Sequence, residues 1–149
     1  QEAIINRTLK LDEGVVKPTM LVQYASNDDA SFASQIVAQL GEFYDVTKTK
    51  VDPAGDINAV NSFMEDIVPL FDILVVVGGN FANDIYAHLY TDITPDDEGC
   101  TIIRYRNWAV LTDTYGVAGW SLNDTQRTVN RFIAIADTLN LPKTDEIIC

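Results

Sequence analysis

The sequence predicts an α/β protein in which helices cover both faces of a mostly parallel sheet, forming a three-layer sandwich. Three observations support this fold class. The unbroken apolar run at residues 73–77 is typical of a strand buried on both faces. Segments with helical periodicity alternate with β-branched segments along the chain. The 149 residues, 47% of them hydrophobic, suffice for one domain with a core and are too few for two.

Two strand–helix units are expected before this central strand. Residues 26–29, Ser-Asn-Asp-Asp, are typical of a helix cap, and Gly41 is a typical stop signal. The segment at 44–51 alternates polar and apolar residues, which predicts an edge strand with one exposed face. The predicted elements are, in chain order, a core strand over 19–25, a helix over about 30–40, the edge strand over 44–51 and a helix over about 57–70.

A hairpin and two helices are expected after the central strand. Arg106 and Asn107 suit a tight turn between two short strands. The predicted elements are, in chain order, a helix over about 83–90, an acidic loop over 91–99, hairpin strands over 101–105 and 108–112, a buried strand over 116–120, a helix over about 124–139 and a short tail to Cys149.

Residues 1–18 precede the single α/β domain predicted for residues 19–149. This N-terminal extension carries apolar side chains in two short groups, at Ile4 and Ile5 and at Leu9 and Leu11. An apolar extension outside a complete domain is a common means of pairing with a neighbouring subunit, so it is predicted to be an assembly arm. An extra edge strand of its own domain is the alternative.

Charge and hydropathy exclude two classes of partner. The net charge is -12 and the pI is near 4.2, so the surface would repel the phosphates of nucleic acids. No apolar stretch approaches the ~20 residues that span a bilayer. We therefore expect no nucleic-acid partner and no membrane span.

Three features predict an exported protein at the cell surface or outside the cell. The first residue is Gln1, as expected after removal of a signal peptide. Asn6 and Asn123 stand in N-x-T triplets that would accept N-linked glycans. Cys100 and Cys149 are an even pair, which predicts one disulfide that closes a loop of ~50 residues and contributes about 4 kcal/mol.

The sequence contains no pattern that indicates catalysis. His88 is the single histidine and falls within a predicted helix, and no nucleophile–base pattern or phosphate-binding glycine motif is present. We therefore expect a non-catalytic protein without a resident cofactor. Carboxylates at 28–29 and 96–98 could hold Ca²⁺, although neither group has the ligand spacing of a known calcium loop.

Two segments in the second half resemble archaeal surface-layer (S-layer) protein domains. The first is the strand that ends at Gly78-Gly79 and continues to Asn83, and the second is Ala118-Gly119-Trp120 followed by Asp124-Thr125. Their order and separation suit that family. The resemblance implies an extracellular, non-catalytic structural domain in which the Gly-Gly and Ala-Gly pairs are architectural turns.

The sequence thus favours an extracellular structural protein that self-assembles, as a surface-layer-like unit or a filament subunit. The alternative is a flavodoxin- or Rossmann-like protein that binds a small ligand or acts as an enzyme at the carboxyl ends of its strands. That site would draw on residues 26–29, 78–83 and 120–125. Its named crevice residues are Asn27, Asp28, Gly78, Gly79, Asn80 and Asn83.

Overall fold

The computed structural model describes residues 17–108 and 111–149. Outside these ranges lie the predicted glycosylation residue Asn6 and the apolar residues of the predicted arm, which are Ile4, Ile5, Leu9 and Leu11. The described chain is an α/β fold, as predicted, with one six-stranded sheet. Its strands are β1 (Thr19–Tyr24), β2 (Asp45–Lys50), β3 (Ile73–Val77), β4 (Thr101–Trp108), β5 (Thr112–Ala118) and β6 (Glu146–Ile148). Its α-helices are α2 (Ala30–Leu40), α3 (Ile57–Ser62), α4 (Asp84–Leu89) and α5 (Leu122–Ala136).

The sheet is mixed, so the prediction of a mostly parallel sheet is only partly matched. Its strand order is β2-β1-β3-β5-β4-β6. The pairs β1–β2, β1–β3 and β3–β5 are parallel, whereas β4 pairs antiparallel with both β5 and β6. Parallel neighbours require crossover connections, which the helices provide, and the antiparallel pair β4–β5 needs only a short turn.

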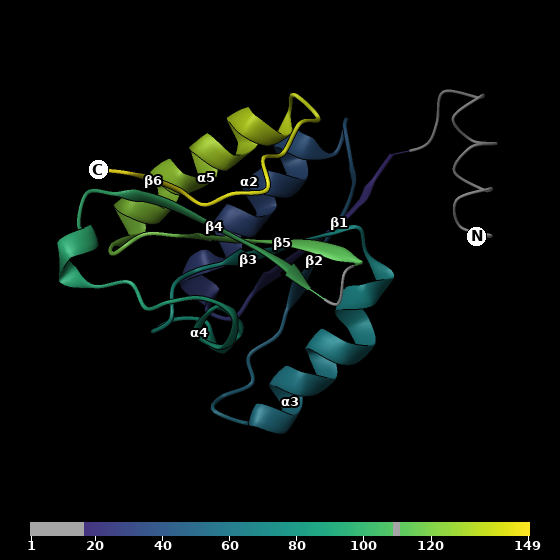
Figure 1. Cartoon of the computed structure of the whole chain (residues 1–149), viewed down its shortest axis with the longest axis horizontal. Helices are drawn as coiled ribbons and strands as arrows, with labels where there is room; N and C mark the ends of the chain where they lie inside the picture. The colour runs from purple at the N-terminus through teal and green to yellow at the C-terminus, as the bar shows by residue number, and fades with distance from the viewer. Residues whose placement is uncertain (1–16, 109–110) are drawn as a thin grey trace.

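Helices cover both faces of the sheet, with α2 and α5 on one side and α3 and α4 on the other (Figure 1). Each face has its own hydrophobic core. Phe32 of α2 and Phe132 of α5 pack with Val75 of β3 on the first face. Met64, which follows α3, and Tyr86 of α4 pack with Leu74 on the second face. Successive β3 side chains point to opposite faces, so both cores need apolar residues from the same strand.

β3 is the central strand that the apolar run predicts. All five of its residues are buried, which confirms that prediction. Its neighbour β1 contributes one buried polar side chain, Gln23. The Gln23 amide donates to the Val51 carbonyl at 2.8 Å, and the Asn83 amide donates to Gln23 Oε1 at 2.9 Å. These bonds satisfy the polar atoms and fix the start of α4 against β1.

The predicted hairpin is wrong in its bounds. Strand β4 continues through Arg106 and Asn107, which pair with Thr114 and Asp113 of β5. The predicted strands 108–112 and 116–120 are therefore replaced by one strand, β5. Side-chain contacts keep the polar residues extended. Across the strands, Asn107 donates to Asp113 Oδ1 at 3.2 Å, and within β4 the Arg106 guanidinium lies 5.5 Å from the centre of the Trp108 ring.

The C-terminal tail adds a strand that the sequence did not predict. Residues 146–148 form β6 at the sheet edge, antiparallel to the first residues of β4. The next residue, Cys149, forms the predicted disulfide with Cys100, which confirms the pairing. The bond joins positions 49 residues apart and closes β6 onto β4.

The predicted helix over 57–70 changes its geometry along its length. It is α-helical only over α3 and continues as a π-helical segment, η2 (Phe63–Ile67), and a 3-10 turn, η3 (Val68–Leu70). Pro69 stands in the last turn and cannot donate a backbone hydrogen bond. The backbone becomes extended at Phe71, directly before β3.

Candidate functional site

The topology places a crevice at the carboxyl ends of β1, β3 and β5. From β1 the chain passes through α2, on one face, to β2. From β2 it returns through α3, on the other face, to β3. The first crossover adds β2 on one side of β1, and the second adds β3 on its other side. The strand order therefore reverses between β1 and β3, and their carboxyl ends form a topological switch point. In open α/β sheets this is where ligands bind.

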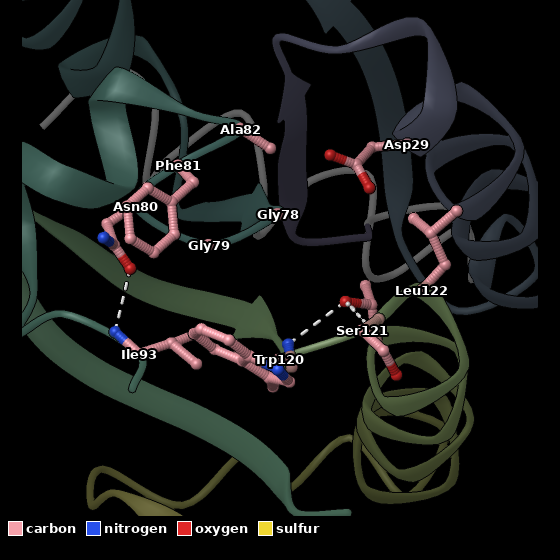
Figure 2. Close-up of a pocket in the computed structure, with 12 residues that line it drawn as sticks. Asp29, Gly78, Gly79, Asn80, Phe81, Ala82, Ile93, Trp120, Ser121 and Leu122 are labelled. Atoms are coloured by element: carbon pink, nitrogen blue, oxygen red, sulfur yellow. Dashed lines mark hydrogen bonds between the residues drawn. The ribbon is translucent and has the colours of Figure 1, made fainter. Parts of the chain in front are cut away.

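The cavity at this point has a volume of about 160 Å³. Segments from four parts of the chain enclose it: the turn before α2, the loop after β3, the loop after α4 and the start of α5 (Figure 2). Its walls are mostly apolar or glycine. They consist of Asp29, Gly78, Gly79, Asn80, Phe81, Ala82, Ile93, Gly119, Trp120, Ser121, Leu122 and Thr125.

Asp29 is the charged residue of this wall. A short 3-10 turn, Asn27–Asp29, places it directly before α2, where Ser26 Oγ accepts the Asp28 N–H at 3.1 Å. Asp29 is only 2% exposed, and its buried Oδ2 atom has no hydrogen-bond partner within residues 17–108 and 111–149. Burial, and to a lesser extent the neighbouring Asp28 carboxylate, raise the pKa of Asp29 to about 6.

The Gly pair after β3 makes room for this carboxylate. Gly78 has φ +99°, and a Cβ atom there would lie 2.4 Å from Asp29 Oδ2. Both the backbone conformation and the space therefore require glycine at this position. Asn80 then accepts the Ile93 N–H at 2.8 Å through Oδ1, which holds the Ile93 side chain in the wall beside Gly79.

Two aromatic rings stand at the mouth of the crevice. Phe81 is 84% exposed and Trp120 is 38% exposed. Their ring centres lie 6.3 Å apart with an edge-to-face angle of 81°, although they come from different loops. Figure 2 shows both rings across the crevice from the Asp29 carboxylate. Leu122, at the start of α5, is also exposed, and these three residues form what we call the rim patch.

A second carboxylate, Asp124, lies behind the Trp120 loop and has a structural role. Ser121 and Asp124 form a capping box at the start of α5, and Asp124 also accepts hydrogen bonds from the Gly99 N–H at 3.1 Å and from Arg127 at 2.9 Å. Burial alone would raise the pKa of Asp124, but these hydrogen bonds together lower it. Its neighbour Asn123, the second predicted glycosylation residue, is exposed in the first turn of α5.

The structure brings together only part of the crevice named from the sequence. Gly78, Gly79 and Asn80 line it. Asn27 points elsewhere and accepts a hydrogen bond from Lys50 Nζ at 2.7 Å. Asp28 is exposed and does not line the cavity. Asn83 is buried as the cap of α4, where it accepts the Ile85 N–H at 3.0 Å.

The sequence reasoning did not single out Asp29, Phe81 or Trp120 as crevice residues. Asp29 and Trp120 fall at the ends of predicted elements, inside ranges assigned to the alternative site. The sequence gives no sign of which of two adjacent aspartates turns inward. The position of Gly78 supplied a partial signal, because a glycine at a strand end often marks close approach of another group.

The described residues place no group of three or more His, Cys, Asp or Glu side chains where they could hold a metal ion. Asp97, in the acidic loop considered for Ca²⁺, accepts the Thr94 N–H at 2.7 Å in a local cap.

Within residues 17–108 and 111–149, no helix has the length and apolar character needed to cross a membrane.

No model of a known protein family matches the sequence, and no curated protein matches it.

Proposed function

We propose that this protein is an exported, non-catalytic structural subunit that assembles with copies of itself, as a surface-layer-like unit or a filament subunit. The observation that carries the proposal is the rim patch, Phe81, Trp120 and Leu122. Large apolar side chains that gather on an exposed surface favour a contact with another protein. Aromatic residues are enriched at such interfaces.

The disulfide supports export. Bonds such as Cys100–Cys149 persist in oxidising environments outside the cytosol. N-linked glycans at Asn6 and Asn123 would fit the same location. Asn123 is exposed, as a glycan requires.

The two edges of the sheet suggest where the arm binds. The edge strand β2 carries Lys48 and Lys50, and exposed lysines discourage strand addition. The opposite edge, β6, presents exposed Ile147 and Ile148. An arm with Ile4, Ile5, Leu9 and Leu11 would add to β6 of a neighbouring subunit through main-chain hydrogen bonds and apolar contacts.

Particle size tests this proposal directly. The full chain should form filaments or sheets in electron micrographs and should sediment as a polymer. A chain without residues 1–16 should remain folded but lose assembly, and Phe81→Ser combined with Trp120→Ser should weaken assembly. Leu70→Ser is the matched control, because Leu70 is an exposed apolar residue outside the rim patch. A uniform species of one or two chains for the intact protein would contradict the proposal.

One observation favours the alternative, a protein that binds a small ligand. The unpartnered Asp29 lies at the topological switch point, where α/β proteins bind ligands. The cavity of about 160 Å³ is well below the 300–1,000 Å³ usual for drug-sized ligands. It therefore suits a small head group better than a nucleotide or a flavin.

A further inference from the structure

The Asp29 carboxylate is buried in the crevice wall, and nothing in the described chain compensates its negative charge. A buried carboxylate costs free energy unless a cation or hydrogen-bond donor compensates it. Among the residues that the structure describes, none donates a hydrogen bond to Asp29 Oδ2, and those that line the crevice include no Lys, Arg or His. The chain as a whole carries a net charge of -12, so its field attracts cations.

The crevice supplies the other contacts that an organic cation needs. Trp120 and Phe81 present aromatic rings at the mouth, and ring faces attract ammonium groups. Ala82, Ile93 and Leu122 add apolar wall for a short alkyl chain. Gly78 and Gly79 complete the lining without side chains of their own.

We propose that this crevice binds a primary ammonium group on a short alkyl chain, with the ammonium beside Asp29 and the chain between Trp120 and the apolar wall. The size of the cavity limits the bound part to a group such as a lysine side chain or a free alkylamine. This proposal does not rest on self-assembly, because the described residues of one chain form the whole crevice.

The pKa of Asp29 makes binding depend on pH. The charged group that acts on it is Asp28, which precedes it in the same turn and raises its pKa further. On the α5 side of the crevice, the Asp124 carboxylate is occupied by Gly99, Ser121 and Arg127. Because Asp29 has a pKa of about 6, it gains a proton below that pH and loses its attraction for a cation.

The experiment is a titration of the full chain followed by amide NMR, with n-butylammonium as the probe and 1-butanol as the uncharged control. Butylammonium should shift the amides of Gly78, Gly79 and Ser121, and 1-butanol should bind at least tenfold more weakly. Asp29→Asn should reduce butylammonium affinity at least tenfold, and Trp120→Ala several-fold. Asp92→Ala, which removes an exposed carboxylate outside the crevice, should change nothing.

Two further measurements complete the test. In the unmodified chain, affinity for butylammonium should fall at least tenfold between pH 7.5 and pH 4.5, so the result does not depend on how any variant folds. Nα-acetyl-lysine N-methylamide separates the two sources: binding as tight as butylammonium indicates a protein lysine side chain, and weaker binding indicates a free amine. Equal binding of 1-butanol and butylammonium, or affinity independent of pH, would overturn the proposal. Sedimentation of the same samples reports self-assembly separately.

Discussion

Asp29 and Asp124 stand at the starts of the two neighbouring helices α2 and α5, and their surroundings are opposite. Asp124 accepts hydrogen bonds from the backbone of Gly99 and Ser121 and from the Arg127 side chain, and its pKa is lowered. Asp29 is equally buried, but its Oδ2 has no partner and its pKa is raised to about 6. The contrast shows that burial alone does not reveal a carboxylate's role: Asp124 stabilises the fold, whereas the buried Asp29 carboxylate lowers its stability.

Loss of the disulfide should lower the free energy of unfolding more than any other change. The accompanying structural change should be confined to the surroundings of Asp124 and should leave those of Asp29 unaltered. Replacing Cys100 and Cys149 together by Ser should lower the free energy of unfolding by about 4 kcal/mol, because the loop of 49 residues is no longer closed in the unfolded chain. Gly99, next to Cys100, donates to Asp124, so this contact should also loosen. Urea unfolding measures the loss, and an unchanged NMR pKa for Asp29 would show that its side is unaffected. A loss below about 1 kcal/mol would contradict the prediction.

Asp124→Ala should lower the free energy of unfolding by about 2 kcal/mol, since it removes the Asp124 half of the capping box and takes the acceptor from the Gly99 and Ser121 N–H groups. The folded-state pKa of Asp124 lies below its ordinary value of 3.8, so its contribution is complete above that pH and is lost as the pH falls through the lowered pKa. The difference from the unmodified chain should therefore shrink in acid. Asp92→Ala serves as the control, with an expected change under about 0.5 kcal/mol. Equal losses in the two variants would argue against a structural role for Asp124.

Asp29→Asn should act in the opposite direction and raise the free energy of unfolding at pH 7 by about 1–2 kcal/mol. The folded-state pKa of about 6 exceeds the ordinary 3.8, so the folded chain binds more protons between these values and stability falls as the pH rises through them. The gain should shrink as the pH falls through this range and be nearly gone at pH 3.5, where Asp29 is mostly protonated in both states. Urea unfolding at pH 7.5 and pH 3.5 measures both limits. A variant that is less stable at pH 7.5 would mean that Asp29 has a structural partner after all.

Phe81→Ala should have the smallest effect, a change in the free energy of unfolding under about 0.5 kcal/mol, because the ring is 84% exposed. The difference in stability from the unmodified chain should be independent of pH, unlike the differences for the two aspartate variants. Thermal unfolding at pH 4 and pH 7.5 checks this. A loss of more than about 1 kcal/mol would show that the Phe81–Trp120 contact supports the fold rather than an outside partner.

Much of the fold was predictable because its signals are local. The apolar run at Ile73–Val77 requires burial on both faces, and the periodicity that predicted a helix over 30–40 matches α2. The alternating β2 segment lies at the sheet edge, as predicted. The hairpin prediction failed because Arg106 and Asn107 are turn-like in isolation, whereas contacts with Trp108 and Asp113 keep them in β4. The short strand β6 could not be predicted, since pairing with β4 and the disulfide hold it in place.

The crevice was predictable in position but not in composition. A parallel sheet places ligand sites at the carboxyl ends of its strands, which pointed to Gly78 and Gly79. The rim patch joins Phe81 to Trp120 from positions far apart in the chain, and no local pattern indicates that two such rings will meet.

The α/β class, the central strand, the acidic composition and the cysteine pair can all be read from the amino-acid sequence, because each follows from composition, spacing or a periodicity within one segment. Which of two aspartates becomes buried depends on how distant segments pack. Asp28 and Asp29 are adjacent and chemically identical in the sequence. The approach of Gly78 from β3 buries one of them without a partner, while the other stays in solvent. A carboxylate's burial and pKa depend on atoms that distant segments bring to it, and the fold alone sets those distances.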